Sequence, residues 1–317
     1  MELMGTNLAY AAAALTKGRL VGIPTETVYG LAANALDPMA VARIFEAKNR
    51  PAFDPLIVHI AQMAEAQKYC SHIPDLAFHL AEKFSPGPLT YILPKNQLIP
   101  DLVSSGHSTV GIRIPNHPLS LALLQQLDFP LAAPSANPFG YVSPTTAQHV
   151  LDQLGQSVAY VLDGGRCQVG LESTIIDLSG TEPRVLRLGG LSLEELEAFL
   201  GQKLAVQTSS SNPKAPGMLV KHYAPNVVLR WEDNAPEQLP QNMGCLRFST
   251  PHAGFAANRQ WILSPKGDLA EAASRLFAVL REIDQAKPDL VLVERFPDTG
   301  LGRAINDRLK RAVQSGA

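Results

Sequence analysis

Short apolar runs alternate with segments of helical periodicity over most of the chain. Strand-length runs rich in apolar residues occur at Leu20–Ile23, Leu56–Ile60, Leu89–Leu93, Gly111–Ile114, Leu131–Ala133, Tyr160–Leu162 and Thr174–Leu178. Between them, apolar residues recur with the spacing of one helix face at Met39–Ala47, Leu76–Phe84, Leu119–Leu127 and Thr145–Leu154. This order predicts an α/β fold built on a twisted mixed sheet.

The pattern changes after one more helix, Leu191–Leu200, in which Ser192 and Glu195 have the spacing of a capping box. Residues 207–225 are rich in Ser, Pro and Gly and follow neither period, so they predict a linker. Beyond it, strands are predicted at Val227–Trp231, Gly244–Phe248, Trp261–Leu263 and Leu290–Val293, and helices at Leu269–Ala286 and from about Gly302. We therefore expect a larger domain over residues 1–206, a linker over 207–225, and a smaller C-terminal α/β domain over 226–317.

Composition narrows the class of protein. The 317 residues suffice for two domains of about 150 residues each. The formal net charge is -2 and only 18% of residues are charged, which argues against nucleic-acid binding as the main activity. Cys70, Cys167 and Cys245 lie too far apart for a Cys-x-x-Cys motif, which favours reduced thiols and a cytoplasmic location. No apolar run approaches the roughly 18 residues of a membrane span, so no membrane partner is expected.

Standard nucleotide-binding and zinc motifs are absent from the sequence, so a site must be built from loops that follow strands. The first such loop, Pro24–Gly30, gathers two threonine hydroxyls, including that of Thr27, a carboxylate and a phenol. It is equally consistent with a capped turn. Lys48 and Arg50 end the helix predicted over Met39–Ala47 and could hold a polyphosphate, although cations also suit a helix C-terminus.

Two predicted strands carry polar side chains. His59 lies in an apolar run, where a histidine is either a hydrogen-bonded core residue or a ligand-binding group. Thr109 and Arg113 are four residues apart, and an even separation in a strand places both on one face. An arginine among apolar residues needs an anionic partner, which can be a ligand or a structural carboxylate.

The remaining candidates lie in loops, and each is weak alone. Ser135 and Asn137 are ordinary turn residues that can also bind a ligand, and Ser143 could cap the next helix. Further candidates are Ser173 before a strand, Arg187 in Val-Leu-Arg-Leu-Gly-Gly, and Lys221, His222 and Tyr223, which are solvated if the linker only tethers the domains.

Taken in order, these segments resemble the threonylcarbamoyl-AMP synthase family, a YrdC-like domain followed by a C-terminal extension. The resemblance is carried by PTETVYGL, AKNRP, PLIVHI, GIRIP, PSAN, ESTIID, VLRLGG, PGM with HYAP, and GLGRAINDRLKRA. It implies that residues 1–206 form the YrdC-like synthase domain. It also implies a nucleotidyltransferase that joins L-threonine, bicarbonate and ATP into threonylcarbamoyl-AMP and releases pyrophosphate. The product would be passed to a downstream transferase complex that modifies adenosine in tRNA.

The resemblance also assigns roles to residues. Lys48 and Arg50 are expected to act in catalysis, and threonine is expected to contact Thr27, His59, Arg113 and Ser173. The nucleotide is expected to contact Lys48, Arg50, Asp54, Thr109, Ser135, Asn137, Ser143, Arg187, His222 and Tyr223. No protein metal site is expected, because Mg²⁺ would accompany ATP.

Three positions depart from the family pattern. Asp54 stands where many relatives have Asn or His, Ala133 where a hydroxyl is common, and Ala215 where Ser is usual. A carboxylate at position 54 helps to bind phosphates only if a metal ion intervenes.

Two further expectations concern the linker and the class of protein. Residues 213–225 are predicted to fold over the site as a lid that excludes water from a hydrolysable adenylate. The alternative function is a non-catalytic RNA-binding module of the same fold, which the near-neutral charge disfavours.

Overall fold

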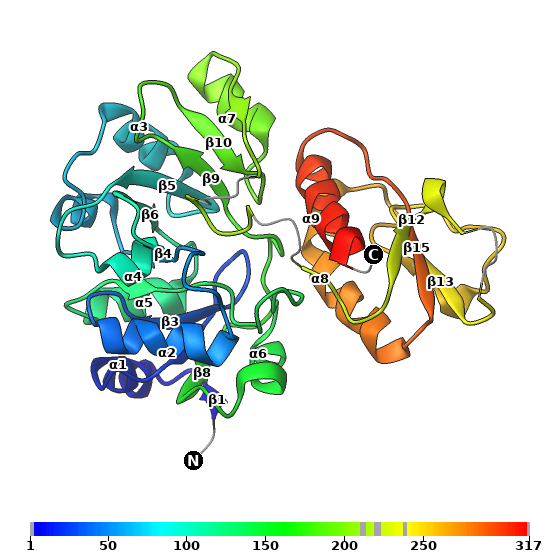
Figure 1. Ribbon diagram of the computed structural model, residues 1–317, viewed down its shortest axis with the longest axis horizontal. Helices are drawn as coiled ribbons and strands as arrows, with labels where there is room; N and C mark the ends of the chain where they lie inside the picture. The colour runs from blue at the N-terminus through cyan, green and yellow to red at the C-terminus, as the bar shows by residue number, and fades with distance from the viewer. Residues whose placement is uncertain (1–2, 210–213, 219–222, 237–239, 316–317) are drawn as a thin grey trace.

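The computed structural model describes residues 3–209, 214–218, 223–236 and 240–315 as two α/β domains (Figure 1). The larger domain is built on one twisted sheet, within the part of the chain that is described. In spatial order its strands are β1 (Met4–Gly5), β8 (Tyr160–Leu162), β2 (Val21–Ile23), β3 (Gly30–Asn34), β7 (Leu131–Ala132), β4 (Ile57–His59), β6 (Thr109–Arg113), β5 (Leu89–Pro94), β9 (Thr174–Asp177), β10 (Arg184–Arg187) and β11 (Ala205–Val206). Parallel and antiparallel pairs alternate irregularly, which confirms the predicted mixed sheet.

The helices of this domain fill the connections between strands. They are α1 (Leu8–Thr16), α2 (Pro38–Lys48), α3 (Asp75–Phe84), α4 (Asp101–Ser104), α5 (Pro118–Gln126), α6 (Ala147–Leu154) and α7 (Leu193–Leu200), with a 3₁₀ turn at Met63–Lys68. The Asp37 side chain caps the start of α2, and Asn49, at φ 50°, ends that helix in the left-handed conformation. Ser192 and Glu195 form the predicted capping box on α7.

The register of three strands positions the side chains that matter for the site. His59 of β4 lies beside Arg113 of β6, and Arg113 lies beside Thr90 of β5. Strand β6 begins at Thr109 and ends at Arg113, so the two side chains belong to one face of the sheet, as predicted.

Four strands of the large sheet are missing from the predicted set: the two-residue strands β1 and β11, and the longer strands β3 and β10. The sequence of β3, Gly-Leu-Ala-Ala-Asn, has no alternation and no β-branched residue, and four of its five residues are buried. The sequence of β10 begins and ends with arginine, which hides its two apolar residues. Both strands pair because neighbouring strands offer backbone partners, which no local pattern reveals.

The smaller domain is a four-stranded parallel sheet covered by two helices, among the residues described. Its strands, in spatial order, are β12 (Leu229–Trp231), β15 (Leu290–Val293), β13 (Met243–Arg247) and β14 (Gln260–Ile262). Its helices are α8 (Leu269–Ala286) and α9 (Leu301–Ser315), with 3₁₀ turns at Glu232–Asn234 and Ala257–Arg259. Figure 1 shows α8 and α9 on the side of this sheet that faces the larger domain.

The two domains share a hydrophobic cluster. Val28, Val142 and Leu171 of the larger domain pack in it with α8 and α9 residues such as Phe277 and Ile305. Hydrogen bonds from Arg281 to the Val142 carbonyl oxygen and from Tyr141 to Asp284 cross the same boundary. The smaller domain is therefore packed against the larger one.

The described part of the segment between the domains does not behave as a free tether. Ala215 and Met218 are buried in a cluster with residues of β4, β5, β9 and β10, and Tyr223 is only 1% exposed. The hydroxyl-to-methyl departure at Ala215 thus falls at a packed position. Tyr223, expected to be solvated if the segment only tethers, is in fact buried because it packs against the smaller domain.

Two general expectations can be compared with the described residues. Cys70, Cys167 and Cys245 are all buried free thiols. No helix in the described ranges combines the length and apolar character that crossing a bilayer requires.

Candidate active site

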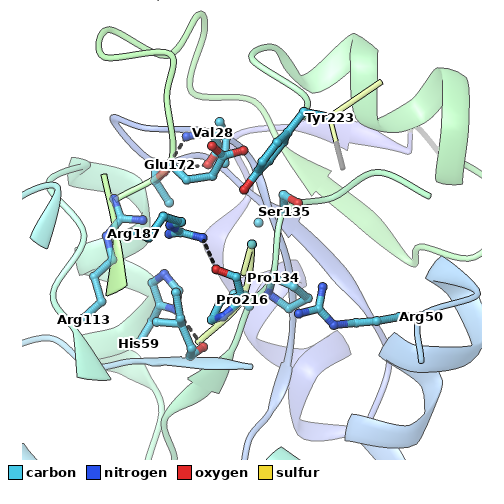
Figure 2. Close-up of a pocket in the computed structure, with 15 residues that line it drawn as sticks. Val28, Arg50, His59, Arg113, Pro134, Ser135, Glu172, Arg187, Pro216 and Tyr223 are labelled. Carbon is cyan, nitrogen blue, oxygen red and sulfur yellow. Dashed lines mark hydrogen bonds between the residues drawn. The ribbon is translucent and has the colours of Figure 1, made fainter. Parts of the chain in front are cut away.

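A small cavity of about 40 Å³ lies where β4, β6 and β10 meet the loops after β2, β7 and β8 (Figure 2). Six of the predicted site residues line it: Arg50, His59, Arg113, Ser135, Arg187 and Tyr223. The rest of the wall comes from Pro216 and Gly217 of the predicted lid and from residues with no predicted role, which are Thr25, Val28, Gly30, Ile57, Ala133, Pro134 and Glu172. Ala133 therefore offers the cavity a methyl group where relatives commonly have a hydroxyl.

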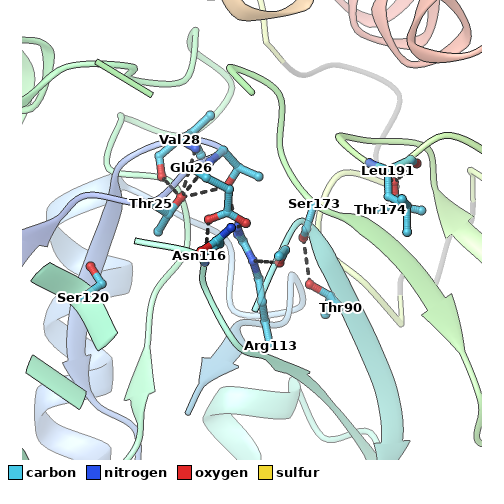
Figure 3. Close-up of polar contacts among 12 residues, drawn as sticks. Thr25, Glu26, Val28, Thr90, Arg113, Asn116, Ser120, Ser173, Thr174 and Leu191 are labelled. Carbon is cyan, nitrogen blue, oxygen red and sulfur yellow. Dashed lines mark hydrogen bonds and ion pairs between the residues drawn. The ribbon is translucent and has the colours of Figure 1, made fainter. Parts of the chain in front are cut away.

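Arg113 and His59 form the end predicted to bind threonine. Arg113 donates from Nη2 to Glu26 Oε1 at 2.7 Å and to Thr27 Oγ1 at 2.8 Å (Figure 3). His59 Nδ1 lies 3.2 Å from the Ile57 carbonyl oxygen. Burial, with the nearby charge of Arg113, lowers the pKa of His59 to about 3, so the ring is neutral at physiological pH.

Ser173 is bound from two sides. Its hydroxyl lies 2.7 Å from that of Thr90 and accepts a hydrogen bond from Arg187 Nη2 at 3.0 Å, while its carbonyl oxygen accepts from Arg187 Nε at 2.9 Å. Thr90 is fully buried and has no predicted role. The only sequence signal for Thr90 is a hydroxyl inside an apolar strand, which is too common to single it out.

Lys48 lies at the end predicted to bind the nucleotide and is 1% exposed. Its Nζ donates to the carbonyl oxygen of Ser135 at 2.5 Å and to that of Asn137. Burial, with a contribution from nearby Arg50, holds the pKa of Lys48 well below its usual range. In its charged form the Lys48 ammonium group has three hydrogens, so one remains for a further acceptor, and a phosphate group there would favour that form.

Arg50 is fixed by its own loop. It donates from Nε to the Asp54 carbonyl oxygen at 3.1 Å and from Nη2 to that of Pro55 at 2.9 Å, and Nη2 lies 2.9 Å from Asp54 Oδ2. Asp54 is completely buried, and burial raises the pKa of its carboxyl group. Thr109 begins β6, which pairs with β4, the strand that follows this loop. Thr109 is buried, and its hydroxyl has no hydrogen bond to any described residue.

Asn137 and Ser143 lie one layer behind the cavity wall. The Asn137 amide donates to the carbonyl oxygens of Pro138 and Tyr141, so it shapes its own loop. The Ser143 hydroxyl donates to Glu172 Oε1 at 2.5 Å. Glu172 has no predicted role, yet it lines the cavity and accepts from Arg308 Nε of α9 at 2.8 Å.

The segment between the domains covers this cavity. Arg187 donates from Nη1 to the Pro216 carbonyl oxygen at 3.2 Å (Figure 2). The Tyr223 ring stacks on Phe277 of α8, and the Arg308 guanidinium lies 4.7 Å from its centroid. His222, also predicted to contact the nucleotide, lies outside the described residues.

Most of the predicted site residues that the structure describes thus converge, whereas the Thr109 hydroxyl neither lines the cavity nor bonds to a residue that does. Thr27 reaches the cavity through Arg113, Ser173 through Arg187, and Lys48 through Ser135. The described residues include no group of three or more His, Cys, Asp or Glu side chains that could hold a metal ion. The arrangement offers cations, hydroxyls and the Glu172 carboxylate around a small cavity.

Comparison with known proteins identifies the family. Residues 13–189 match a family described as "Telomere recombination", and residues 191–313 match "Threonylcarbamoyl-AMP synthase, C-terminal domain". The chain is 40% identical to the threonylcarbamoyl-AMP synthase of Pyrococcus abyssi, covering 95% of this chain and 92% of that protein. The Bacillus subtilis protein of the same name is 39% identical, covering 96% and 92%. The chain belongs to the threonylcarbamoyl-AMP synthase family.

A solved structure supports the same assignment for the whole chain. The crystal structure of Pyrococcus abyssi Sua5 complexed with L-threonine superposes with a TM-score of 0.89 at 36% identity, covering 100% of this chain and 98% of that one. The family has an enzyme's name, so a catalytic protein is favoured over the non-catalytic RNA-binding alternative. The expected YrdC-like fold with a smaller α/β domain is confirmed. The individual roles given to the site residues stay predictions.

Proposed function

We propose that this protein synthesises L-threonylcarbamoyl-AMP from L-threonine, bicarbonate and ATP, and so acts as a nucleotidyltransferase. The supporting observation is the charge at the nucleotide end of the cavity. Lys48, Arg50 and Arg187 are buried around the carboxylate of Asp54, and their charges act on it to lower its pKa against the larger effect of burial. Glu172, the carboxylate in the cavity wall, is paired with Arg308 of α9. The cations around Asp54 therefore leave excess positive charge in a dry place, which a triphosphate would neutralise.

The chemistry needs positioning more than a protein nucleophile. The threonine nitrogen first bonds to the carbon of bicarbonate and water leaves, which gives a carbamate. A carbamate oxygen then attacks the α-phosphorus of ATP, and the bond to the β-phosphate oxygen breaks as pyrophosphate leaves. Negative charge develops on the oxygens of the α-phosphate and of the departing pyrophosphate, where Lys48, Arg50 and Arg187 can stabilise it.

Magnesium enters this proposal as part of the substrate, MgATP. The described residues form no carboxylate cage, and Asp54, the carboxylate beside the nucleotide end, is already paired with Arg50. Such a donor set fits an ion held by phosphate oxygens and water rather than by the protein. The chain's own contribution is therefore the cations around the triphosphate.

Residues 214–218 and Tyr223 are proposed to act as a lid. Ligand pockets usually measure about 300–1,000 Å³, whereas the cavity under Pro216 and Gly217 measures about 40 Å³. The segment must therefore move to admit ATP, and its return excludes water from the adenylate. When the lid opens again, the adenylate would be released to a tRNA-modifying transferase complex.

The direct test is release of pyrophosphate from ATP and bicarbonate, with and without threonine. We expect threonine-dependent release, and we expect Lys48→Ala to reduce it by at least about tenfold, equivalent to about 1.4 kcal/mol of barrier. Lys83→Ala, on the exposed face of α3, is the matched control and should leave the rate unchanged.

Two results would speak against the proposal. One is pyrophosphate release that does not depend on threonine. The other is tight, steeply salt-dependent tRNA binding without any release, which would restore the RNA-binding alternative.

A further inference from the structure

Glu26 lies behind the cavity wall and holds Arg113 in one orientation. Both hydrogens of Arg113 Nη2 are used, one by Glu26 Oε1 at 2.7 Å and one by Thr27 Oγ1 at 2.8 Å. Nε donates to the Gly87 carbonyl oxygen at 3.4 Å. Of the three guanidinium nitrogens of Arg113, Nη1 is the one that donates no hydrogen bond to a described residue. Nη1 is therefore the part of Arg113 that remains for a substrate. The two-nitrogen fork expected for a carboxylate is not presented in this arrangement.

Glu26 is itself held from two sides. Its side chain is 6% exposed, Oε1 accepts from Arg113, and Oε2 accepts from the Asn116 backbone N–H at 3.0 Å. Its own carbonyl oxygen accepts from the Val169 backbone N–H at 2.7 Å. Figure 3 shows the carboxylate placed between Asn116 and the end of the Arg113 side chain. Since Glu26 is not among the residues that line the cavity, it acts on a substrate through Arg113.

The threonine hydroxyls on the same loop complete the support. Thr25 Oγ1 donates to the Val28 carbonyl oxygen at 2.6 Å, so its single hydrogen is used. The 2.8 Å contact between Thr25 and Thr27 must then use the hydrogen of Thr27. Thr27 is left as an acceptor for Arg113, so its hydroxyl and the Glu26 carboxylate fix the same nitrogen.

We infer that Glu26 is a positioning residue for the threonine substrate: it turns Arg113 so that Nη1 alone meets the substrate carboxylate. This inference rests on the proposed function, in which Arg113 binds that carboxylate. Fixing one nitrogen fixes the direction of the carboxylate and hence of the amino group that must reach bicarbonate. A small misplacement of reacting atoms costs a large factor in rate, so orientation is the quantity that Glu26 controls.

The test compares threonine with threoninamide, which has no carboxylate charge. We measure kcat/KM for both substrates in the wild type and in Glu26→Gln. For each protein we take the ratio of kcat/KM for threonine to kcat/KM for threoninamide. The ratio should fall by about fivefold or more in Glu26→Gln, because the carboxylate is no longer held in its productive direction. The KM for ATP should stay within about twofold. Glu82→Gln, exposed on α3, is the matched control and should leave the ratio unchanged.

Arg113→Lys separates this inference from the proposed function. If Arg113→Lys leaves the ratio unchanged, the assignment of Arg113 to the substrate carboxylate fails. If Arg113→Lys lowers the ratio and Glu26→Gln does not, the positioning role of Glu26 is wrong. An equal loss for both substrates and for ATP in Glu26→Gln also overturns it, because that result indicates general damage to the fold. Should Glu26→Gln fail to fold, Glu26→Asp, which keeps the charge on a shorter arm, is measured in the same way and should also lower the ratio.

Discussion

His59 shows how a single residue can combine two readings of the sequence. It is 2% exposed in the apolar strand β4 and uses Nδ1 against a backbone carbonyl, as a core histidine does. It also lines the cavity beside Arg113, as a ligand-binding histidine does. The core reading is met, because β4 is part of the core; β4 also forms the wall of the site, and the contact of His59 with a ligand stays a prediction.

The pH dependence of stability tests the environment of His59. Its pKa is lowered to about 3 in the folded protein, so between that value and about 6.5 the unfolded chain binds the extra proton. The stability gained from the neutral ring is complete above about pH 6.5 and is lost as the pH falls toward 3. We expect the wild type to lose about 2 kcal/mol more than His59→Gln between pH 7 and pH 5.

Denaturant unfolding at both pH values gives this difference directly. His79→Gln is the control, because His79 is at an exposed position of α3 away from the cavity. Equal pH dependence in the wild type and His59→Gln would show that the ring is not buried as described.

The residues that the sequence could predict are those with distinctive chemistry in a recognisable motif. Lys48, Arg113 and Ser135 are of this kind, and all three belong to the wall or its immediate support. Glu26 and Glu172 lie in the same motifs but were not predicted, because their importance depends on which arginine each one meets. That pairing is set by the register of distant strands and by packing between domains, which no local pattern contains.

At the scale of elements, the segment that covers the cavity depends on one glycine. Gly217 has φ 85°, and a Cβ atom built there would lie 2.6 Å from the Tyr223 hydroxyl oxygen and 3.1 Å from Arg187 Cδ. An L-residue is disfavoured at this position by both the backbone angle and the contact. Glycine therefore allows Pro216 to approach Arg187 and close the cavity.

Gly217→Ala should open this cover. We expect the ratio of pyrophosphate released to threonylcarbamoyl-AMP recovered to rise by about threefold or more, because water reaches the adenylate. The measurement is a parallel assay of both products. Gly180→Ala is the matched control, since Gly180 is in the turn before β10 with no atom within 4 Å of its Cβ position. Unchanged coupling in Gly217→Ala would remove the argument for a lid.

Elements differed in how well their sequences predicted them. The helix Leu269–Ala286 and the strand Leu290–Val293 have the predicted bounds, because one has a long apolar face and the other is uniformly apolar. Residues 207–225 were predicted as a linker from composition, yet their described part is packed. Small residues there allow the backbone to pack closely against other elements. Composition alone does not distinguish this use of small residues from their use in a flexible linker.

At the scale of the whole molecule, Arg308 connects the smaller domain to the site. Its side chain is fully buried and donates to Glu172 Oε2 at 2.8 Å, to Asp307 Oδ2 at 2.8 Å and to the Leu188 carbonyl oxygen at 2.9 Å. Burial alone would raise the pKa of Glu172, but the charges of Arg308 and Arg187 outweigh it, so this pKa is lowered. The smaller domain thus supplies the counter-ion of a cavity residue.

Arg308→Ala should weaken both the contact between domains and catalysis. Removing one partner of a buried ion pair costs about 3–5 kcal/mol, since Glu172 would remain charged and buried. We expect a matching loss in the free energy of unfolding and a fall in threonine-dependent pyrophosphate release. Lys310→Ala, at an exposed position of α9, should change neither. A stable, fully active Arg308→Ala protein would show that the domains work independently.

The segment that covers the cavity is anchored at both ends by a strand. Before it, β11 pairs with β10 in the larger sheet, and after it, β12 pairs with β15 in the smaller one. Reclosure is therefore an intramolecular event with a high effective concentration, and its rate should not change with dilution of the enzyme. A single backbone cut in this stretch would release that constraint and let one end diffuse, even with every side chain still present.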